Sequence, residues 1–346
     1  MSFDPNGVGV ANGNLFGFPC TEAEADLIII PIPWDATASY GKGTSNGPQA
    51  ILDASTQLDF FHPRLEKAYE TKIFLTPISE EWKAINDSLN DRASEYFLDL
   101  EQLGEASAQL KHKAIIDEIN TAHEALTSNL KSRVETLIQS GKICAVLGGE
   151  HSTPLGLIQA INAHYTSFSI LQIDAHADLR NAYEGFNQSH ASIMYNVVES
   201  CDKLNQLVQV GIRDLSSDEY ERSLTHPKIT TYFDWNLKEE SFHGKTWSTQ
   251  CDEIIESLSN DVYISFDIDG LIPNLCPNTG TPVAGGFTLE QLSFLIFKLV
   301  DSGRKIIGFD LNEVSPGSSG DWDANVGARV LWQLVCATEL SRRKSC

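Results

Sequence analysis

Apolar runs alternate with amphipathic stretches along almost the whole chain. Six short runs are apolar at nearly every position, which is typical of parallel strands covered on both faces. These predicted strands span residues 26–31, 144–147, 169–173, 207–210, 262–266 and 306–309. Helices are predicted between them, at residues 48–55, 115–140, 289–299 and 324–340. The pattern predicts an α/β fold, a three-layer α/β/α sandwich around a central parallel sheet.

One segment breaks this alternation. Residues 80–140 are polar, charged and mostly helix-forming, and strand signals vanish there. We interpret the segment as a helical elaboration on the surface of a single domain that covers residues 1–346, because no linker-like stretch divides the chain. Three loops rich in Gly and Pro, at residues 41–47, 274–286 and 315–320, are longer than turn chemistry requires, and such loops often carry specificity.

Composition narrows the class of protein. The formal net charge is −22, which opposes nucleic-acid binding, since that requires a basic surface. The apolar runs are far shorter than the ~20 residues that span a bilayer, and residues 1–20 lack the basic and apolar regions of a secretion signal. The 7 cysteines are scattered without a CxxC pair, so reduced thiols are expected. These features predict a cytoplasmic protein with no membrane or nucleic-acid partner.

Acidic and histidine side chains follow three of the predicted strands. In two of these segments they alternate along the chain, so they face one side of an extended strand end. In the other, a histidine follows a tight Gly-Gly turn. The carboxyl ends of parallel strands meet at one edge of a sheet, which is where ligands bind. The candidate ligands are His151 in the first segment, Asp174, His176 and Asp178 in the second, and Asp267 and Asp269 in the third.

Two imidazoles and four carboxylates form a ligand set for two divalent metal ions. Taken one at a time, these residues could equally be helix N-caps or satisfied polar groups near the surface. Packed together without cations, however, the carboxylates would repel one another strongly. Oxygen-rich ligation with imidazole and without thiolate points to Mn(II) first, with Ni(II), Co(II) or Fe(II) as alternatives, whereas structural zinc is not expected. Two such ions can share one water and lower its pKa, which predicts a hydrolase.

Four motifs resemble the signatures of the ureohydrolase superfamily of arginases, agmatinases, formimidoylglutamases and guanidine hydrolases. They are Gly148-Gly149-Glu150-His151-Ser152, Asp174-Ala175-His176-Ala177-Asp178, Ser265-Phe266-Asp267-Ile268-Asp269-Gly270 and Phe309-Asp310-Leu311-Asn312-Glu313. The resemblance implies an α/β/α sandwich, assembly as a homo-oligomer (trimer or hexamer) and two metals bridged by Asp174 and Asp267. His151 and Asp178 would complete the ligand set of one metal, and His176 and Asp269 that of the other.

The resemblance also assigns two catalytic roles. Glu313 matches the carboxylate that pairs with the guanidinium group of the substrate, and His190 matches a histidine that passes a proton to the leaving amine. A solvated glutamate and an exposed histidine are the alternatives for these positions. The implied reaction is attack of a metal-bridging hydroxide on the guanidinium carbon. This cleaves a C–N bond and releases urea together with ammonia or an amine.

Substrate choice depends on the loops. Trp34 and Trp322 could form walls around a small guanidinium group, or could belong to the core. Arg180 could instead receive a carboxylate, an arrangement similar to that of some formimidoylglutamases. The motifs around these residues look most similar to the agmatinase and guanidine hydrolase branch. The expected substrate is therefore a small cationic guanidinium compound, guanidine or an agmatine-like molecule.

Two other functions stay open beside this one. The first is hydrolysis of formimidoylglutamate, and the second is a non-catalytic role as a metal-binding partner subunit of a ureohydrolase complex. A zinc-dependent deacetylase of a related fold is disfavoured by the paired aspartates. Two residues depart from the family pattern: Ile272 stands where many members have Asp, and Glu150 replaces the commoner Asp before the metal histidine. An interaction that fixes the loop after Asp269 could therefore be missing, whereas metal ligation is expected to be unaffected.

Overall fold

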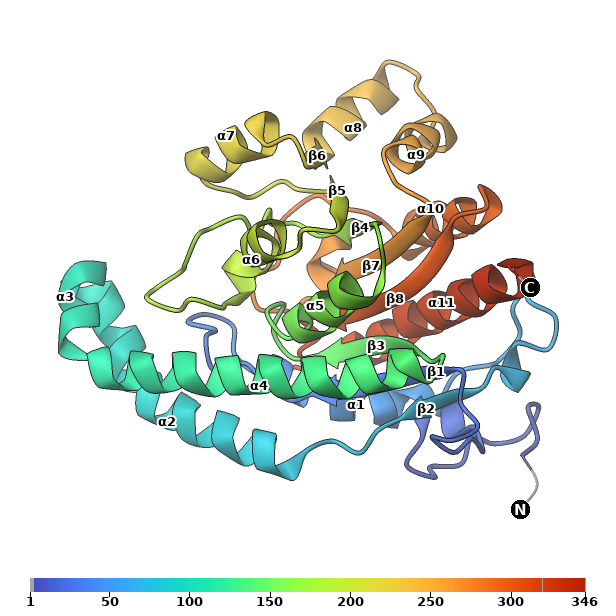
Figure 1. The fold of residues 1–346 in the computed structure, drawn as a ribbon, viewed down its shortest axis with the longest axis horizontal. Coiled ribbons are helices and arrows are strands. Elements are labelled where there is room, and N and C mark those ends of the chain that lie inside the picture. Colours follow the sequence, from blue (N-terminus) through green and yellow to red (C-terminus); the bar gives the residue numbers. More distant parts are fainter. Residues whose placement is uncertain (1–2, 319, 346) are drawn as a thin grey trace.

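A computed structural model describes residues 3–318 and 320–345 of the chain. Its centre is one 8-stranded sheet in the order β2-β1-β3-β8-β7-β4-β5-β6, and every pair of neighbours is parallel (Figure 1). The strands are β1 (Leu27–Ile32), β2 (Ile73–Leu75), β3 (Ile143–Gly148), β4 (Phe168–Ile173), β5 (Leu204–Val210), β6 (Ile229–Tyr232), β7 (Asp261–Asp267) and β8 (Lys305–Asn312). The six predicted strands are the six inner ones. The prediction missed the edge strands β2 and β6, which are short and only partly buried.

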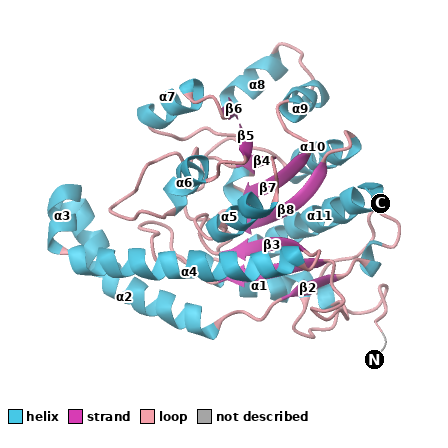
Figure 2. Cartoon of the chain, in the orientation of Figure 1, coloured by secondary structure: helices cyan, strands magenta, loops and turns pink. Residues whose placement is uncertain are grey.

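Helices cover both faces of the sheet, and this confirms the predicted three-layer sandwich (Figure 2). Side chains alternate across each strand: Ala145 and Leu147 of β3 join one apolar core, while Cys144 and Val146 join the other. The first core packs against α1 (Gly47–Ser55), α8 (Asp234–Phe242), α9 (Trp247–Glu256), α10 (Leu289–Asp301) and α11 (Trp322–Ser345). The second packs against α2 (Glu80–Leu103), α4 (Lys113–Gln139), α5 (Leu155–His164) and α6 (Ile193–Ser200). The outlying helices are α3 (Glu105–Lys111) and α7 (Ser217–Thr225).

The segment at residues 80–140 forms α2, α3 and α4, and it is more than the surface elaboration that its polarity suggested. Ile119, Leu126 and Val134 of α4 are buried in the second core, where α4 packs against α5. Helix α2 lies along the outer side of α4, and α3 joins the two at the far end (Figure 1). Both long helices keep a polar outer face, because each presents only one stripe to the core. The sequence signal was therefore that of amphipathic helices.

Four inner strands end side by side at one edge of the sheet. In spatial order these are β3, β8, β7 and β4, which carry Gly148, Asn312, Asp267 and Ile173 at their carboxyl ends. Because neighbouring strands run parallel, the segments that follow them meet at this edge.

Among the described residues, no helix combines the length and the apolarity that crossing a membrane would need.

Candidate metal and guanidinium site

One group of candidate ligands gathers around His151. Its Nδ1 atom lies 3.0 Å from Oδ2 of Asp174, 3.0 Å from Oδ2 of Asp178 and 3.3 Å from Oδ2 of Asp267. All four side chains are buried, and this ring nitrogen has no hydrogen-bond partner of good geometry. A buried imidazole nitrogen that faces three carboxylate oxygens is the donor arrangement of a metal site.

A second group shares Asp174 with the first. His176 Nδ1 lies 3.0 Å from Oδ2 of Asp269 and 3.8 Å from Oδ1 of Asp174. The ligand atoms of Asp174, His176 and Asp269 lie within 4.8 Å of one another, as do those of His151, Asp174 and Asp178. The two groups thus meet at one carboxylate, as two adjacent cations require. All six residues predicted as ligands are brought together at this edge of the sheet.

The pKa shifts of these buried side chains indicate that bound positive charge would be favourable in both groups. Burial raises the pKa of Asp174 to about 7, and the nearby carboxylates of Asp178 and Asp269 add to the shift. Burial also raises the pKa of Asp267 well above its usual range. Burial alone would lower the pKa of His176, yet the surrounding carboxylates raise it well above the ordinary value. So many buried acidic groups fit divalent cations, which would take the place of the protons.

Hydrogen bonds to neighbouring side chains and backbone groups hold several of the candidate ligands in place. Gln172 Nε2 donates to Oδ2 of Asp174 at 2.8 Å, and the backbone N–H of Ala175 donates to Oδ1 of Asp269 at 3.0 Å. Nε2 of His151 lies 2.9 Å from Oγ of Ser265, and that hydroxyl donates in turn to Oδ1 of buried Asp310 at 3.1 Å. Such contacts hold the imidazole in the orientation that presents Nδ1 to the carboxylates.

Glu313 and His190 lie beside these groups. Glu313 follows β8 and adopts a positive φ of 63°, and its Oε1 accepts a hydrogen bond of 2.8 Å from the backbone N–H of His151. Burial raises the pKa of Glu313 to about 8, although the charge of His190 opposes the shift. His190 Nδ1 lies 3.5 Å from Oε2 of Glu150. Burial lowers the pKa of His190, but Glu150 reverses this and raises it.

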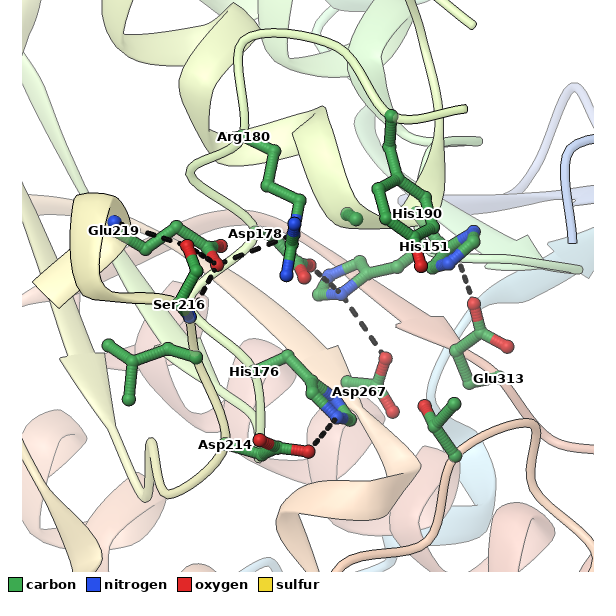
Figure 3. Close-up of a pocket in the computed structure, with 14 residues that line it drawn as sticks. His151, His176, Asp178, Arg180, His190, Asp214, Ser216, Glu219, Asp267 and Glu313 are labelled. Atoms are coloured by element: carbon green, nitrogen blue, oxygen red, sulfur yellow. Dashed lines mark hydrogen bonds and ion pairs between the residues drawn. The ribbon is translucent and has the colours of Figure 1, made fainter. Parts of the chain in front are cut away.

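A pocket of about 270 Å³ opens onto both metal groups. Figure 3 shows Glu313 on one side of it and Asp214, Ser216 and Glu219 on the other. Arg180 also lines this pocket, but its Nε lies 3.4 Å from Oε2 of Glu219 and its guanidinium carbon lies 4.9 Å from the centre of the Tyr183 ring. The positive charge of Arg180 is thus already shared with a carboxylate and an aromatic ring.

The two predicted tryptophan walls lie elsewhere. Trp34 is fully buried, and its ring packs 5.2 Å from that of His123 and 6.4 Å from that of Trp82. Trp322 begins α11 with half of its surface exposed, and its Nε1 donates to the backbone oxygen of Asn274. Neither residue lines the pocket. Trp34 serves the core instead, because its indole fills the space beneath the helices α2 and α4.

Sequence reasoning missed the loop after β5. Asp214 lines the pocket opposite Glu313 and pairs in register with His176. The apolar strand before it was recognised, so a strand-end carboxylate was the available signal. Arg213 of the same loop donates to the backbone oxygens of Asp269 at 2.6 Å and of Leu271 at 3.3 Å. These bonds hold the segment that leads to Ile272, where a loop-fixing interaction was expected to be missing.

The comparison with protein families decides the relationship. The model of the arginase family matches residues 25–337. The chain belongs to the arginase family. The expected resemblance is therefore confirmed, and with it the class of enzyme, a hydrolase that acts on C–N bonds of linear amidines.

Several relatives match over nearly their whole length. An N(1)-aminopropylagmatine ureohydrolase of Synechocystis is 28% identical over 325 residues, which cover 93% of this chain and 92% of that one. An enzyme of the same name from Thermus thermophilus is 31% identical and covers 89% and 88% of the two chains. The crystal structure of an agmatine ureohydrolase from Thermoplasma volcanium covers 95% of each chain with a TM-score of 0.70 at 22% identity. That likeness shows the shared fold.

Proposed function

We propose that this chain hydrolyses an aminoalkyl guanidine of the agmatine class to urea and an amine, with the help of two divalent metal ions. The observation that carries the proposal is the pocket itself. Two histidine–aspartate groups that share Asp174 lie on its floor, with the carboxylate of Glu313 beside them. The relatives from Synechocystis and Thermus, which are named for a guanidino substrate of this kind, support the same substrate class.

Each part of the site has a distinct task in this reaction. His151, Asp174, Asp178 and Asp267 would hold one metal, and Asp174, His176, Asp267 and Asp269 the other. When bound, two such cations supply hydroxide at neutral pH and stabilise the charge that develops on the substrate. Mn(II) is the expected metal and Ni(II) the alternative, because the donor set combines oxygen and imidazole without thiolate.

Glu313 would orient the substrate. Glu313 is half-buried and burial raises the pKa of its carboxyl to about 8, so a nearby positive charge would favour the ionised form, and a planar guanidinium group offers that charge with two N–H donors. This pairing would hold the guanidinium carbon above the metal groups in a single orientation. His190, which also lines the pocket, would donate a proton to the leaving nitrogen, so that the amine departs neutral.

The far side of the pocket favours a second positive charge on the substrate. The side chain of Asp214 is 68% exposed, and its Oδ2 lies 3.9 Å from Nε2 of His176. Glu219 already offsets part of the charge of Arg180, which weakens the attraction of Arg180 for a carboxylate tail such as that of formimidoylglutamate. An alkyl ammonium tail directed toward Asp214 would meet a carboxylate that is largely exposed. Guanidine, which has no tail, is the second candidate, because it can use Glu313 alone.

The first experiment measures urea and ammonia released by purified protein loaded separately with Mn(II) or Ni(II). The substrates are agmatine, N(1)-aminopropylagmatine, guanidine, arginine and formimidoylglutamate. We expect urea from agmatine or its aminopropyl derivative, and the Glu313→Gln variant prepared in parallel is the control for contaminating activity. Turnover of formimidoylglutamate alone would refute the proposed substrate class. Silence across the panel in protein with two metals per chain would favour the non-catalytic partner role.

The predicted oligomer is part of this proposal. We expect a trimer or hexamer in solution, as the family resemblance implies, and light scattering coupled to gel filtration measures it directly.

A further inference from the structure

Helices α2 and α4 hold two loops, one of which contributes Arg180 and Tyr183 to the pocket lining while the other contacts Glu150 behind it. The β1 loop (residues 33–46) follows β1, and the β4 loop (residues 179–189) runs from Asp178 to His190. Neither helix contributes a side chain to the pocket lining. The side chains that these helices direct at the two loops are nevertheless linked to His190 through the loops and Glu150, so a role in catalysis would be one of positioning.

The β1 loop is tied to α2 through one buried carboxylate. Oδ2 of Asp35 accepts hydrogen bonds from the backbone N–H groups of Gly43 at 3.0 Å and Ser45 at 3.1 Å. Oδ1 accepts from Nδ2 of Asn86 at 3.0 Å and of Asn90 at 2.6 Å. The backbone N–H of Asp35 also donates to Oδ1 of Asn86 at 2.7 Å. Asn86 is fully buried and binds both the backbone and the side chain of Asp35.

The β1 loop is linked to His190 through Glu150. Oγ1 of Thr37 lies 2.7 Å from both carboxylate oxygens of Glu150, to which it donates. Glu150 is fully buried, and its Oε2 lies 3.5 Å from Nδ1 of His190. Oγ of Ser152 also donates to Oε1 of Glu150 at 2.9 Å, so a displacement of the β1 loop would withdraw one of the two hydroxyls that hold the carboxylate facing His190. The path from α2 runs through Asn86, Asp35, Thr37 and Glu150.

The same helices also hold the β4 loop. Oη of Tyr96 on α2 donates to the backbone oxygen of Glu184 at 2.6 Å. Asn120 on α4 donates to the backbone oxygen of Gly185 at 3.0 Å and accepts from the backbone N–H of Asn187 at 2.9 Å. Oγ1 of Thr127 donates to Oε1 of Gln188, two residues before His190, at 2.7 Å. His190 is thus approached from two sides by groups anchored on this helical pair.

We propose that Asn86 is a positioning residue that holds the β1 loop through Asp35 and so keeps Glu150 and His190 in their working geometry. The effect on turnover rests on the proposed function, whereas the anchoring of the loop does not. Because proton transfer by a placed side chain contributes about 10²- to 10⁴-fold, partial misplacement in Asn86→Ala should lower kcat about tenfold. KM should change less, since Glu313 and the metal ligands keep their own supports.

The kinetic test compares Asn86→Ala, Thr37→Val and the double variant on the substrate found with the panel. If Asn86 acts through the β1 loop, its replacement adds little once Thr37 has lost its hydroxyl, and the effects on kcat are not additive. Gln102→Ala, an exposed position on the same helix, is the matched control and should leave kcat unchanged. Fully additive effects, or unchanged kcat in Asn86→Ala, would overturn the proposal. If Asn86→Ala does not fold, Asn90→Ala removes one donor from Asp35 and takes its place.

A second measurement needs no substrate. Hydrogen exchange of the metal-loaded protein should show protected amides at Gly43 and Ser45, because both donate to Asp35. In Asn86→Ala this protection should fall, while the amides of β3 and β8 keep theirs. If protection falls in Asn86→Ala but the wild-type protein turns over none of the substrates, the proposed function is refuted. The proposal that Asn86 anchors the β1 loop is then still supported. Unchanged protection in the β1 loop would overturn the anchor itself.

Discussion

The floor and the rim of the pocket are built on different principles. On the floor, His151, Asp174 and Asp267 are buried, belong to strand ends or tight turns, and depend on one another for charge compensation. At the rim, Arg180 and Asp214 are partly or largely exposed and belong to longer loops. We therefore expect substitutions on the floor to abolish the proposed reaction, and substitutions at the rim to change its rate without abolishing it. The comparison suggests that the floor defines the reaction class and the rim the choice of substrate.

The largest effect is expected from removing the carboxylate that both groups of candidate ligands share. Asp174→Ala should reduce metal content from two ions per chain to one or fewer and bring urea release down to background. Asp174 lies in both ligand groups, so neither group keeps its full donor set. Elemental analysis of dialysed protein and the urea assay measure the two effects. Asp301→Ala, which changes a surface carboxylate, should leave both unchanged.

Glu313→Gln separates metal binding from substrate orientation. Truncating one partner of a buried charge pair costs about 2 to 5 kcal/mol, so kcat/KM should fall by about 30-fold to about 4,000-fold. Metal content should stay at the wild-type value, because Glu313 is not among the proposed ligands. A variant that retains wild-type kcat/KM would exclude Glu313 as the guanidinium partner. A variant that loses its metals would show that Glu313 contributes to metal binding instead.

The crowded floor also predicts how pH affects the metal-free protein. The folded pKa of Asp174 is raised to about 7 from an ordinary value of 3.8, so the folded state binds an extra proton between those values. Its contribution to stability is present below pH 3.8 and is lost as pH rises through 7. The raised pKa values of Asp267 and His176 act in the same direction.

The measurement is the thermal midpoint of chelator-treated protein from pH 4 to pH 8, with metal-loaded protein alongside. The midpoint of the metal-free form should decrease across this range, while that of the loaded form should decrease less, because the cations replace the protons. Asp174→Asn, which cannot ionise, should show a shallower decrease. A metal-free midpoint that rises with pH would contradict the predicted sign.

A substitution at the rim should lower kcat/KM less, and by an amount that depends on the substrate. Asp214→Asn should lower kcat/KM for agmatine by up to about fivefold, since an exposed ion pair contributes up to about 1 kcal/mol. Turnover of guanidine, which has no distal ammonium group, should stay within about twofold. Asp218→Asn, an exposed neighbour outside the pocket lining, is the control. Equal losses on both substrates would show that Asp214 acts through His176 and not on the tail.

The limits of sequence reasoning differ between these regions in a physical way. Inner strands are apolar on both faces, so a run such as Phe168–Ile173 is recognisable from composition alone. The edge strand Ile229–Tyr232 is covered less completely, and its mixed composition concealed it. Trp34 followed a strand end in the same way as the ligands, yet its side chain turned into the core. Position along the chain does not reveal the direction in which a side chain points.

The sequence by itself predicted the candidate metal ligands that the structure brings together, because side chains that alternate after buried parallel strands converge at the carboxyl edge of the sheet. It also determined the class of fold, since doubly apolar strands require helices on both faces. Only the tertiary structure decided which rim residues face the cavity, that Arg180 is already paired with Glu219, and that α2 contacts the loop after β1 through Asn86 and Asp35. Those contacts join segments far apart in the chain, and their partners are chosen by packing rather than by local pattern.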